Sequence, residues 1–237
     1  MNRKESRMFT LEGKRLPTWN PVTGCLYMCK YCWARKMATT KLRHTRKYRL
    51  GFKPQIHMHE FKRKFKKGEL YFVSDMGDLF GSWVPSEWIV KVLKHIERFP
   101  GTRFLFLTKN PARYFEFIDV FPRNVVLGAT IETDRDTIYV GHGVSRAPLP
   151  TSRLRAMGKL EWKHKLISIE PILKFNLKRM VEWMITINPE IIYIGYDNYG
   201  NKLPEPALND TLKLIDCLET HGFTVIVKTL RRAWWEK

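Results

Sequence analysis

Short, continuously apolar runs recur along this 237-residue chain and are separated by amphipathic segments. Runs of this kind are typical of strands buried on both faces, as in a parallel sheet covered by helices. We expect strands at Leu70–Val73, Phe104–Leu107, Val125–Ile131, Leu166–Ile169, Ile191–Ile194 and Phe223–Val227, with a shorter one near Trp19–Thr23.

The segments between these runs carry the 3.6-residue period of helices. Residues 86–99 are the clearest case, and residues 177–184 follow the same pattern. Asn110 is predicted to be the N-cap, and Pro111 the first residue, of a short helix. Residues 207–220 end before Gly222, which suits a helix cap. The alternation predicts an α/β fold and suits a TIM-like (β/α) barrel, incomplete if only about six or seven parallel strands form.

Two polar, basic stretches interrupt this alternation, near residues 46–68 and 133–164. Long loops inside a compact domain are usually functional or disordered, so we expect both to be insertions. Residues 1–17 are predicted to be a polar N-terminal extension, and residues 18–237 a single barrel domain.

Composition excludes several classes of protein. The chain is 44% hydrophobic and 13% aromatic, which is typical of a globular protein. It has no apolar run near the roughly 20 residues of a membrane span, and its charged first ten residues do not resemble a signal peptide. With few cysteines and no disulfide framework, we expect a cytoplasmic protein without a membrane partner.

Positive charge is concentrated in one part of the chain. The net charge is +19, and residues 35–67 contain 13 Lys and Arg against the single acid Glu60. Such a segment repels itself and is best explained by an anionic partner, although a solvated surface is the simpler alternative. The cations predicted to contact a phosphate backbone are Arg43, Arg46, Lys47, Lys62, Arg63, Lys64 and Lys66.

Three of the four cysteines lie within eight residues, at Cys25, Cys29 and Cys32, in the spacing C-x3-C-x2-C. Three thiolates on one loop can hold three irons of a 4Fe-4S cluster and leave the fourth iron open. A structural zinc site is the alternative, with His44, His57 or His59 as the fourth ligand. Cys217 lies among apolar helical positions and is predicted to be an ordinary packed residue.

The cysteine spacing, with Tyr31 directly before Cys32, resembles the signature of the radical S-adenosylmethionine (SAM) superfamily. This resemblance implies a TIM-like barrel and a 4Fe-4S cluster whose open iron is chelated by SAM. It also implies cleavage of SAM to a 5′-deoxyadenosyl radical and an electron donor such as ferredoxin or flavodoxin.

Further segments extend the resemblance over roughly residues 17–230. They resemble a little-characterised radical-SAM-like family, associated with phages and prophages and placed near spore photoproduct lyase. That family usually has Gly-Gly-Glu after the fifth strand, where this chain has Gly195-Tyr196-Asp197. The segments are Trp19–Cys25, Ser74–Gly81, Leu107–Pro111 and Ser168–Pro171.

Polar residues end almost every predicted strand, and in parallel barrels the active site lies at the carboxyl ends of the strands. The resemblance implies that Tyr31 lies against the cluster and adenine, and that Ser74 and Asp75 receive the methionyl amino group of SAM. Lys109 suits the methionyl carboxylate.

The remaining strand ends have expected roles too. Glu132 suits the ribose hydroxyls, while Glu170 and Asp197 face the substrate region and are candidates for moving a proton.

The substrate is predicted from charge and aromatic residues together. Trp33, Tyr48 and Phe52 are interleaved with the basic segment, and Trp234-Trp235 follow two arginines. Cations neutralise phosphates and flat rings stack on exposed bases, so a nucleic acid, RNA or DNA, is the leading substrate class. Two alternatives stay open: a nucleic-acid-binding module with a structural metal site, and a radical SAM enzyme for a small anionic metabolite or a protein.

Overall fold

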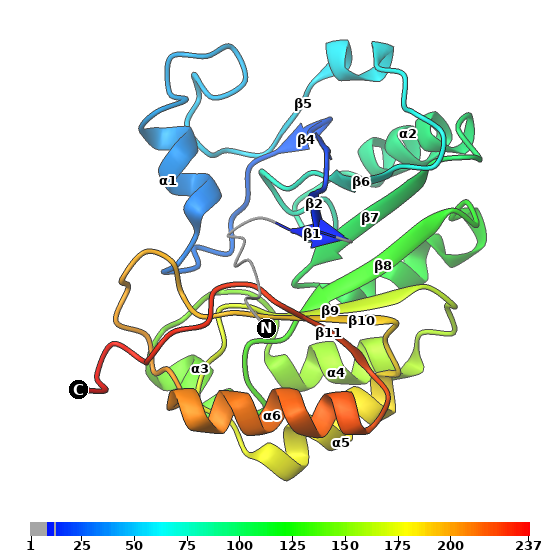
Figure 1. The fold of residues 1–237 in the computed structure, drawn as a ribbon. Helices are drawn as coiled ribbons and strands as arrows, with labels where there is room; N and C mark the ends of the chain where they lie inside the picture. The colour runs from blue at the N-terminus through cyan, green and yellow to red at the C-terminus, as the bar shows by residue number, and fades with distance from the viewer. Residues whose placement is uncertain (1–8, 12) are drawn as a thin grey trace.

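A seven-stranded parallel sheet forms the centre of the computed structural model, which describes residues 9–11 and 13–237 (Figure 1). The strand order is β11-β10-β9-β8-β7-β6-β3, and every neighbouring pair is parallel. The strands are β3 (Thr18–Trp19), β6 (Leu70–Val73), β7 (Arg103–Thr108), β8 (Val125–Thr130), β9 (Lys165–Ile169), β10 (Ile191–Ile194) and β11 (Thr224–Val227).

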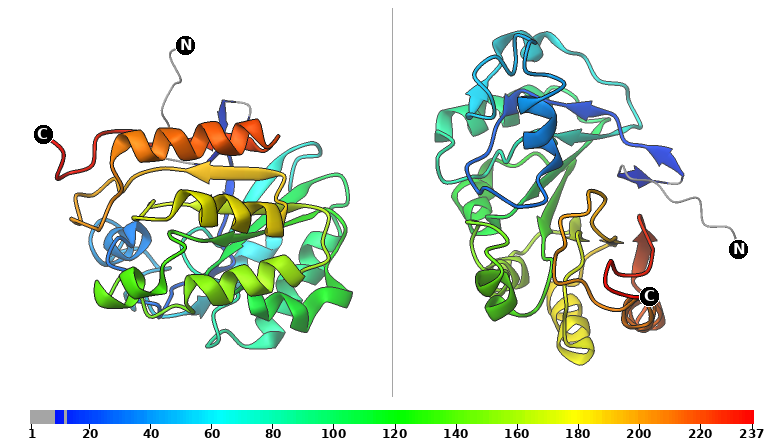
Figure 2. Two further views of the ribbon diagram at one scale, coloured as in Figure 1. Left: turned by 90° about the horizontal axis from the view of Figure 1, so that it is seen from below. Right: turned by 90° about the vertical axis from the view of Figure 1, so that its left-hand side faces the viewer.

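Helices cover the outer face of this curved sheet, and α4, α5 and α6 lie side by side against it (Figure 2). The helical elements are α1 (Trp33–Thr39), η1 (Met58–Lys62), α2 (Ser86–Glu97), η2 (Pro111–Val120), α3 (Asp136–Gly141), α4 (Pro150–Lys159), α5 (Leu177–Ile187) and α6 (Leu208–Thr220). Because β3 and β11 are the edges of the sheet as described, the barrel is incomplete, and the predicted fold is confirmed.

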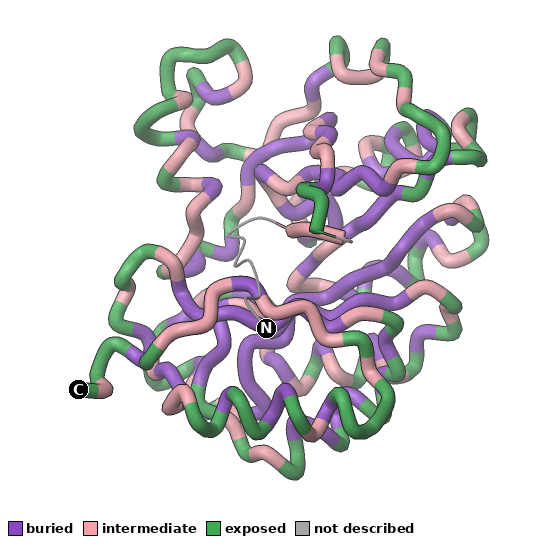
Figure 3. Tube along the Cα trace, in the orientation of Figure 1, coloured by how far each residue is buried: buried purple, intermediate pink, exposed green. Residues whose placement is uncertain are grey.

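Strands β6, β8 and β9 are buried along their whole length, which explains their continuous apolar runs, whereas the edge strand β11 is only partly buried (Figure 3). In β6, Tyr71 and Val73 belong to the large core beneath the helices, whereas Leu70 and Phe72 belong to a smaller cluster on the inner face. Alternate residues of a strand point to opposite faces, so each strand supplies side chains to both clusters.

An N-terminal hairpin covers part of the inner face. It consists of β1 (Thr10–Leu11) and β2 (Lys14–Arg15). The ring of Phe9 packs edge-on against Phe72 and Tyr193, with centroid distances of 5.2 Å and 4.7 Å. Phe9, Leu11 and Leu16 of the predicted N-terminal extension therefore pack onto the barrel, and residues 1–8 and 12 lie outside the described residues.

Three local expectations need correction. The segment 133–164, expected as a basic insertion, contains α3 and α4, and α4 packs against η2 and α5 as part of the helical layer. The apolar run near Trp19–Thr23 is divided: β3 joins the main sheet, but β4 (Val22–Thr23) pairs with β5 (Gln55–Ile56) in a separate antiparallel ribbon. Asn110 does not cap η2 with its side chain, because its amide donates to the Phe80 carbonyl instead.

Candidate active site at the carboxyl ends of the strands

A cavity of about 230 Å³ opens where the strands of the sheet end. It is lined by the cysteine loop (residues 25–32) and by residues at the ends of β6, β7, β9, β10 and β11. The sequence-predicted residues that line it are Cys25, Cys29, Tyr31, Cys32, Asp75, Lys109, Glu170 and Asp197, whereas Ser74 and Glu132 are not among the lining residues.

The three thiols of the cysteine loop face this one cavity. Cys29 is buried, with its sulfur 3.1 Å from the Ser145 hydroxyl. Cys32 caps α1, because its sulfur accepts a hydrogen bond of 3.3 Å from the Arg35 amide. Burial raises the pKa of the Cys25 and Cys32 thiols, so holding them as thiolates requires a compensating positive charge such as a metal centre.

The histidines proposed as a fourth zinc ligand lie elsewhere. His57 bonds to the Thr23 hydroxyl at 2.7 Å, His59 lies 3.6 Å from Glu60, and His44 accepts a hydrogen bond from Arg43. Across residues 9–11 and 13–237, no three His, Cys, Asp or Glu side chains converge as the ligands of a single ion do, and this holds for the three cysteines too. None of the three histidines lines the cavity with the cysteines, so their positions do not favour the zinc alternative. Three thiols on one wall, with no imidazole beside them, fit a larger cluster with an open corner.

A close backbone crossing fixes the cysteine loop against the basic loop of residues 40–53. Gly24 has φ +89°, and a Cβ at this position would lie 2.3 Å from the Lys53 carbonyl oxygen. The Cys25 amide donates to the Phe52 carbonyl at 3.2 Å. Only glycine allows this approach, which also places Phe52 in the cavity wall.

The end of β6 supplies one polar wall of the cavity. Asp75 accepts a 2.6 Å hydrogen bond from the side-chain amide of Asn20, and burial raises the pKa of its carboxyl group. Ser74 has φ +56°, and its buried hydroxyl has no hydrogen-bond partner among the described residues. Asp78 was not predicted from the sequence as a site residue; it accepts from Thr108 and from the Lys109 amide and so ties β6 to β7.

Glu132 is the centre of a buried charge network behind the cavity wall. Its Oε2 accepts from the Arg153 guanidinium at 2.6 Å, and its Oε1 accepts from Lys109 at 3.0 Å and from the Tyr31 hydroxyl. Burial alone would raise the pKa of Glu132, but the Arg153 and Lys109 cations lower it to about 2. With both oxygens engaged, Glu132 holds Lys109 and Tyr31 in place.

Arg153 is the residue of this network that sequence reasoning missed. Its side chain is fully buried and also donates to the carbonyls of Thr130 and Pro148. In the sequence, Arg153 is one of several cations of the 133–164 segment. Its inward position is indicated only by the apolar residues around it, which are Leu154, Ala156 and Met157.

The two candidate acids at the far wall differ in their surroundings. Glu170 pairs with Lys228, which is only 3% exposed. Asp197 accepts two hydrogen bonds from Asn201, at 2.7 Å from its amide and 2.9 Å from its side chain, and so closes its own loop. Glu170 is therefore the acid with a charged partner inside the cavity.

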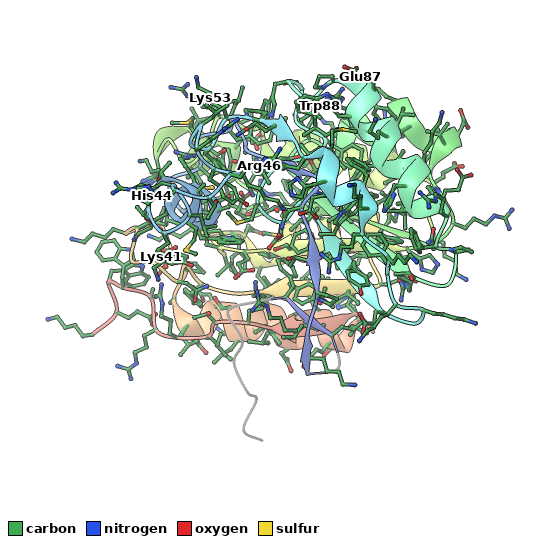
Figure 4. The ribbon with its side chains drawn as sticks, turned by 90° about the horizontal axis from the view of Figure 1, so that it is seen from above. Lys41, His44, Arg46, Lys53, Glu87 and Trp88 are labelled. Carbon is green, nitrogen blue, oxygen red and sulfur yellow. The ribbon has the colours of Figure 1, made fainter. Side chains whose placement is uncertain are left out.

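The predicted nucleic-acid contacts fall into separate groups. Arg43 and Arg46 are exposed in the basic loop. Figure 4 shows Arg46 together with Lys41 and Lys53, which belong to the same loop. Lys62, Lys64 and Lys66 lead instead to the amino end of β6, where the Lys66 carbonyl accepts from Thr102.

Two of the predicted cations have structural partners. Lys47 pairs with Glu60, and Arg63 donates to the Thr18 carbonyl at 2.7 Å. Trp234 and Trp235 donate their indole N–H groups to the carbonyls of Leu203 and Glu205. Lys47 and Arg63 therefore tie segments of the chain together, whereas Trp234 and Trp235 remain exposed despite these hydrogen bonds.

Comparison with known proteins supports the fold. A family described as "Protein of unknown function (DUF5131)" matches residues 15–188, and no curated protein matches the chain. Spore photoproduct lyase with bound AdoMet and dinucleoside spore photoproduct is 12% identical with a TM-score of 0.57, over 85% of this chain and 60% of the lyase. A point variant of that lyase gives 11% identity and a TM-score of 0.59, over 89% and 75% of the two chains.

SuiB from Streptococcus suis, bound to its precursor peptide SuiA, is 11% identical with a TM-score of 0.54, over 90% of this chain and 49% of SuiB. This chain thus spans about three fifths of the lyase in the first of these structures and about half of SuiB. No helix in the described residues is long and apolar enough to cross a membrane. The match over most of its length places the chain in the DUF5131 family, and its fold is the incomplete barrel of the radical SAM enzymes.

Proposed function

We propose that this protein is a radical SAM enzyme whose 4Fe-4S cluster is held by Cys25, Cys29 and Cys32. The observation that carries the proposal is that these three thiols face a single cavity at the carboxyl ends of a parallel sheet. The shared fold with AdoMet-binding enzymes supports it.

Bound at these three cysteines, such a cluster would supply the electron needed to cleave SAM to a 5′-deoxyadenosyl radical. The residues of this chain bind and orient the cofactor. Lys109 presents an ammonium group suited to the methionyl carboxylate, and Asp75 presents a carboxylate suited to the methionyl amino group. Glu132 positions Lys109 and Tyr31 from behind.

Proton transfer to or from the substrate is assigned first to Glu170. Its pairing with the buried Lys228 keeps a charged acid–base pair inside the cavity, and a catalytic acid or base must lie within reach of the reacting group. Asp197 lines the same wall but is held by Asn201, so we assign it chiefly to the shape of the cavity.

A nucleic acid is the substrate class that the surface supports best. Trp33, Phe52 and Tyr199 line the cavity, and the exposed cations of the basic loop lie next to Phe52 along the chain. Aromatic rings stack on unpaired bases, and cations bind the backbone that carries them. A base held in a polymer reaches such a cavity only when it is unpaired or flipped out.

The test is anaerobic reconstitution with iron, sulfide, reductant and SAM. We expect about four irons per chain and formation of 5′-deoxyadenosine. Cys25→Ala, Cys29→Ala and Cys32→Ala should each lose the cluster, while Cys217→Ala, on helix α6, should retain it. Stoichiometric zinc in place of iron, or equal loss of iron in Cys217→Ala, contradicts the proposal.

A further inference from the structure

Along the cysteine loop, residues that line the cavity alternate with residues that are exposed to solvent. Cys25, Tyr27 and Cys29 line the cavity. Between them, Leu26 and Met28 are 47% and 46% exposed. A partner that covers both side chains would remove their apolar surface from water, which favours association. Leu26 directly follows Cys25 and Met28 directly precedes Cys29, so this outer surface lies next to two of the three cysteines along the chain.

A second segment completes this surface with positive charge. The Lys30 amide donates to the Val144 carbonyl at 3.0 Å, and the Arg146 amide donates to the Tyr27 carbonyl at 2.7 Å. The side chains of Lys30, His142 and Arg146 are exposed. Residues 24–36 and 139–149 contain no Asp or Glu. We name this surface the cluster-loop face: Leu26, Met28, Lys30, His142 and Arg146.

We propose that the cluster-loop face docks an acidic electron carrier of the flavodoxin type. This inference rests on the proposed function, because only a redox centre at the three thiols needs such a partner. One electron passes from the reduced carrier to that centre, so the carrier is oxidised, the centre is reduced, and no bond forms or breaks at the face.

The geometry favours this face over the cavity mouth. Electron transfer slows steeply with distance, so the carrier must approach the thiols closely, and the mouth is the route of the substrate. An apolar centre with a cationic rim complements an acidic partner and suits the small, transient interfaces of electron-transfer complexes.

The first test is binding of reduced flavodoxin at low salt. The variant Met28→Asp/Arg146→Glu reverses the character of the face, and Met28 has φ 54°, a conformation that Asp tolerates better than most residues. The control Val120→Asp/Arg123→Glu makes the same chemical change at an exposed site at the end of η2. We expect the face variant to bind at least about tenfold more weakly than wild type and the control to bind normally. Equal affinity of the two variants overturns the proposal.

The second test compares reductants in SAM cleavage. We expect the face variant to lose flavodoxin-driven cleavage at limiting flavodoxin while keeping dithionite-driven cleavage, because dithionite needs no docking surface. Loss of both with normal flavodoxin binding overturns the proposal. If wild type itself cleaves no SAM with dithionite, the proposed function fails, and the binding measurement still decides whether the face docks flavodoxin.

Discussion

Replacing Arg153 with Met tests the buried network that holds Lys109 and Tyr31. The guanidinium of Arg153 is fully buried and bonds to the Glu132 carboxylate, which is also fully buried. In Arg153→Met, one cation is removed and the carboxylate stays behind with Lys109 and Tyr31. Removing one partner of a buried ion pair leaves an uncompensated charge, and this typically costs about 3–5 kcal/mol.

The lowered pKa of Glu132 also indicates how much its ion pairs stabilise the fold. Lowering the pKa of Glu132 from the ordinary 4.5 to about 2 corresponds to about 3 kcal/mol of stability. Because the pKa is lowered on folding, this contribution is fully present above pH 4.5 and is lost as the pH falls towards 2. Wild type should therefore lose stability in this window. Arg153→Met should lose much less there, because the main cation that lowers the Glu132 pKa is gone.

The assay is urea unfolding followed by circular dichroism at pH 7 and at several values down to pH 3. Arg155→Met is the matched control, because Arg155 is exposed on the same helix and should change stability by at most about 0.5 kcal/mol. If Arg153→Met and Arg155→Met unfold at the same urea concentration, the network does not stabilise the fold and the reasoning is refuted.

Two further predictions concern ligands. Asp75→Ala and Lys109→Ala should each keep the cluster but weaken SAM binding by about 1.5–3 kcal/mol, as measured by equilibrium dialysis. The controls Asp119→Ala and Lys91→Ala, at exposed sites, should leave SAM binding unchanged. Unchanged SAM affinity in the first two variants would assign SAM binding to other strand ends. Charge reversal to Glu at Lys41, Arg43 and Arg46 should reduce the slope of log affinity for single-stranded nucleic acid against log salt by about 2–3. The same reversal at Lys62, Lys64 and Lys66 should reduce it less, and equal effects would restore the whole 35–67 segment as the binding surface.

The strands and the cysteine loop could be predicted from the sequence because their signals are local. The runs around Phe72, Leu105 and Ile167 are apolar on both faces, and each became a strand of the parallel sheet. The polar residues that follow them meet at one cavity because parallel strands end at the same edge of the sheet. This is how Asp75, Lys109 and Glu170 came to be named without any contact information.

Long-range pairing could not be predicted in the same way. Nothing in the composition of residues 133–164 indicates that Arg153 turns inward to Glu132, because a cation on an amphipathic helix usually lies in solvent. The basic segment is continuous in sequence, yet the chain passes through β5 and η1 and delivers its second half to the amino end of β6. The sequence gives the number of cations in this segment, but the separation of its two halves in space follows from the path of the chain through β5 and η1.

The close crossing at Gly24 fixes the end of the basic loop against the cysteine loop. Because Lys53 and Phe52 lie directly against Gly24 and Cys25, the loop cannot slide along the cavity without moving a thiol. Under the proposed function, the span from a phosphate bound by Arg43 or Arg46 to the reacting position would then be set by the fold. Such an enzyme would act at a set number of nucleotides from the bound phosphate, and residues inserted between the loop tip and Lys53 would shift that position along the strand.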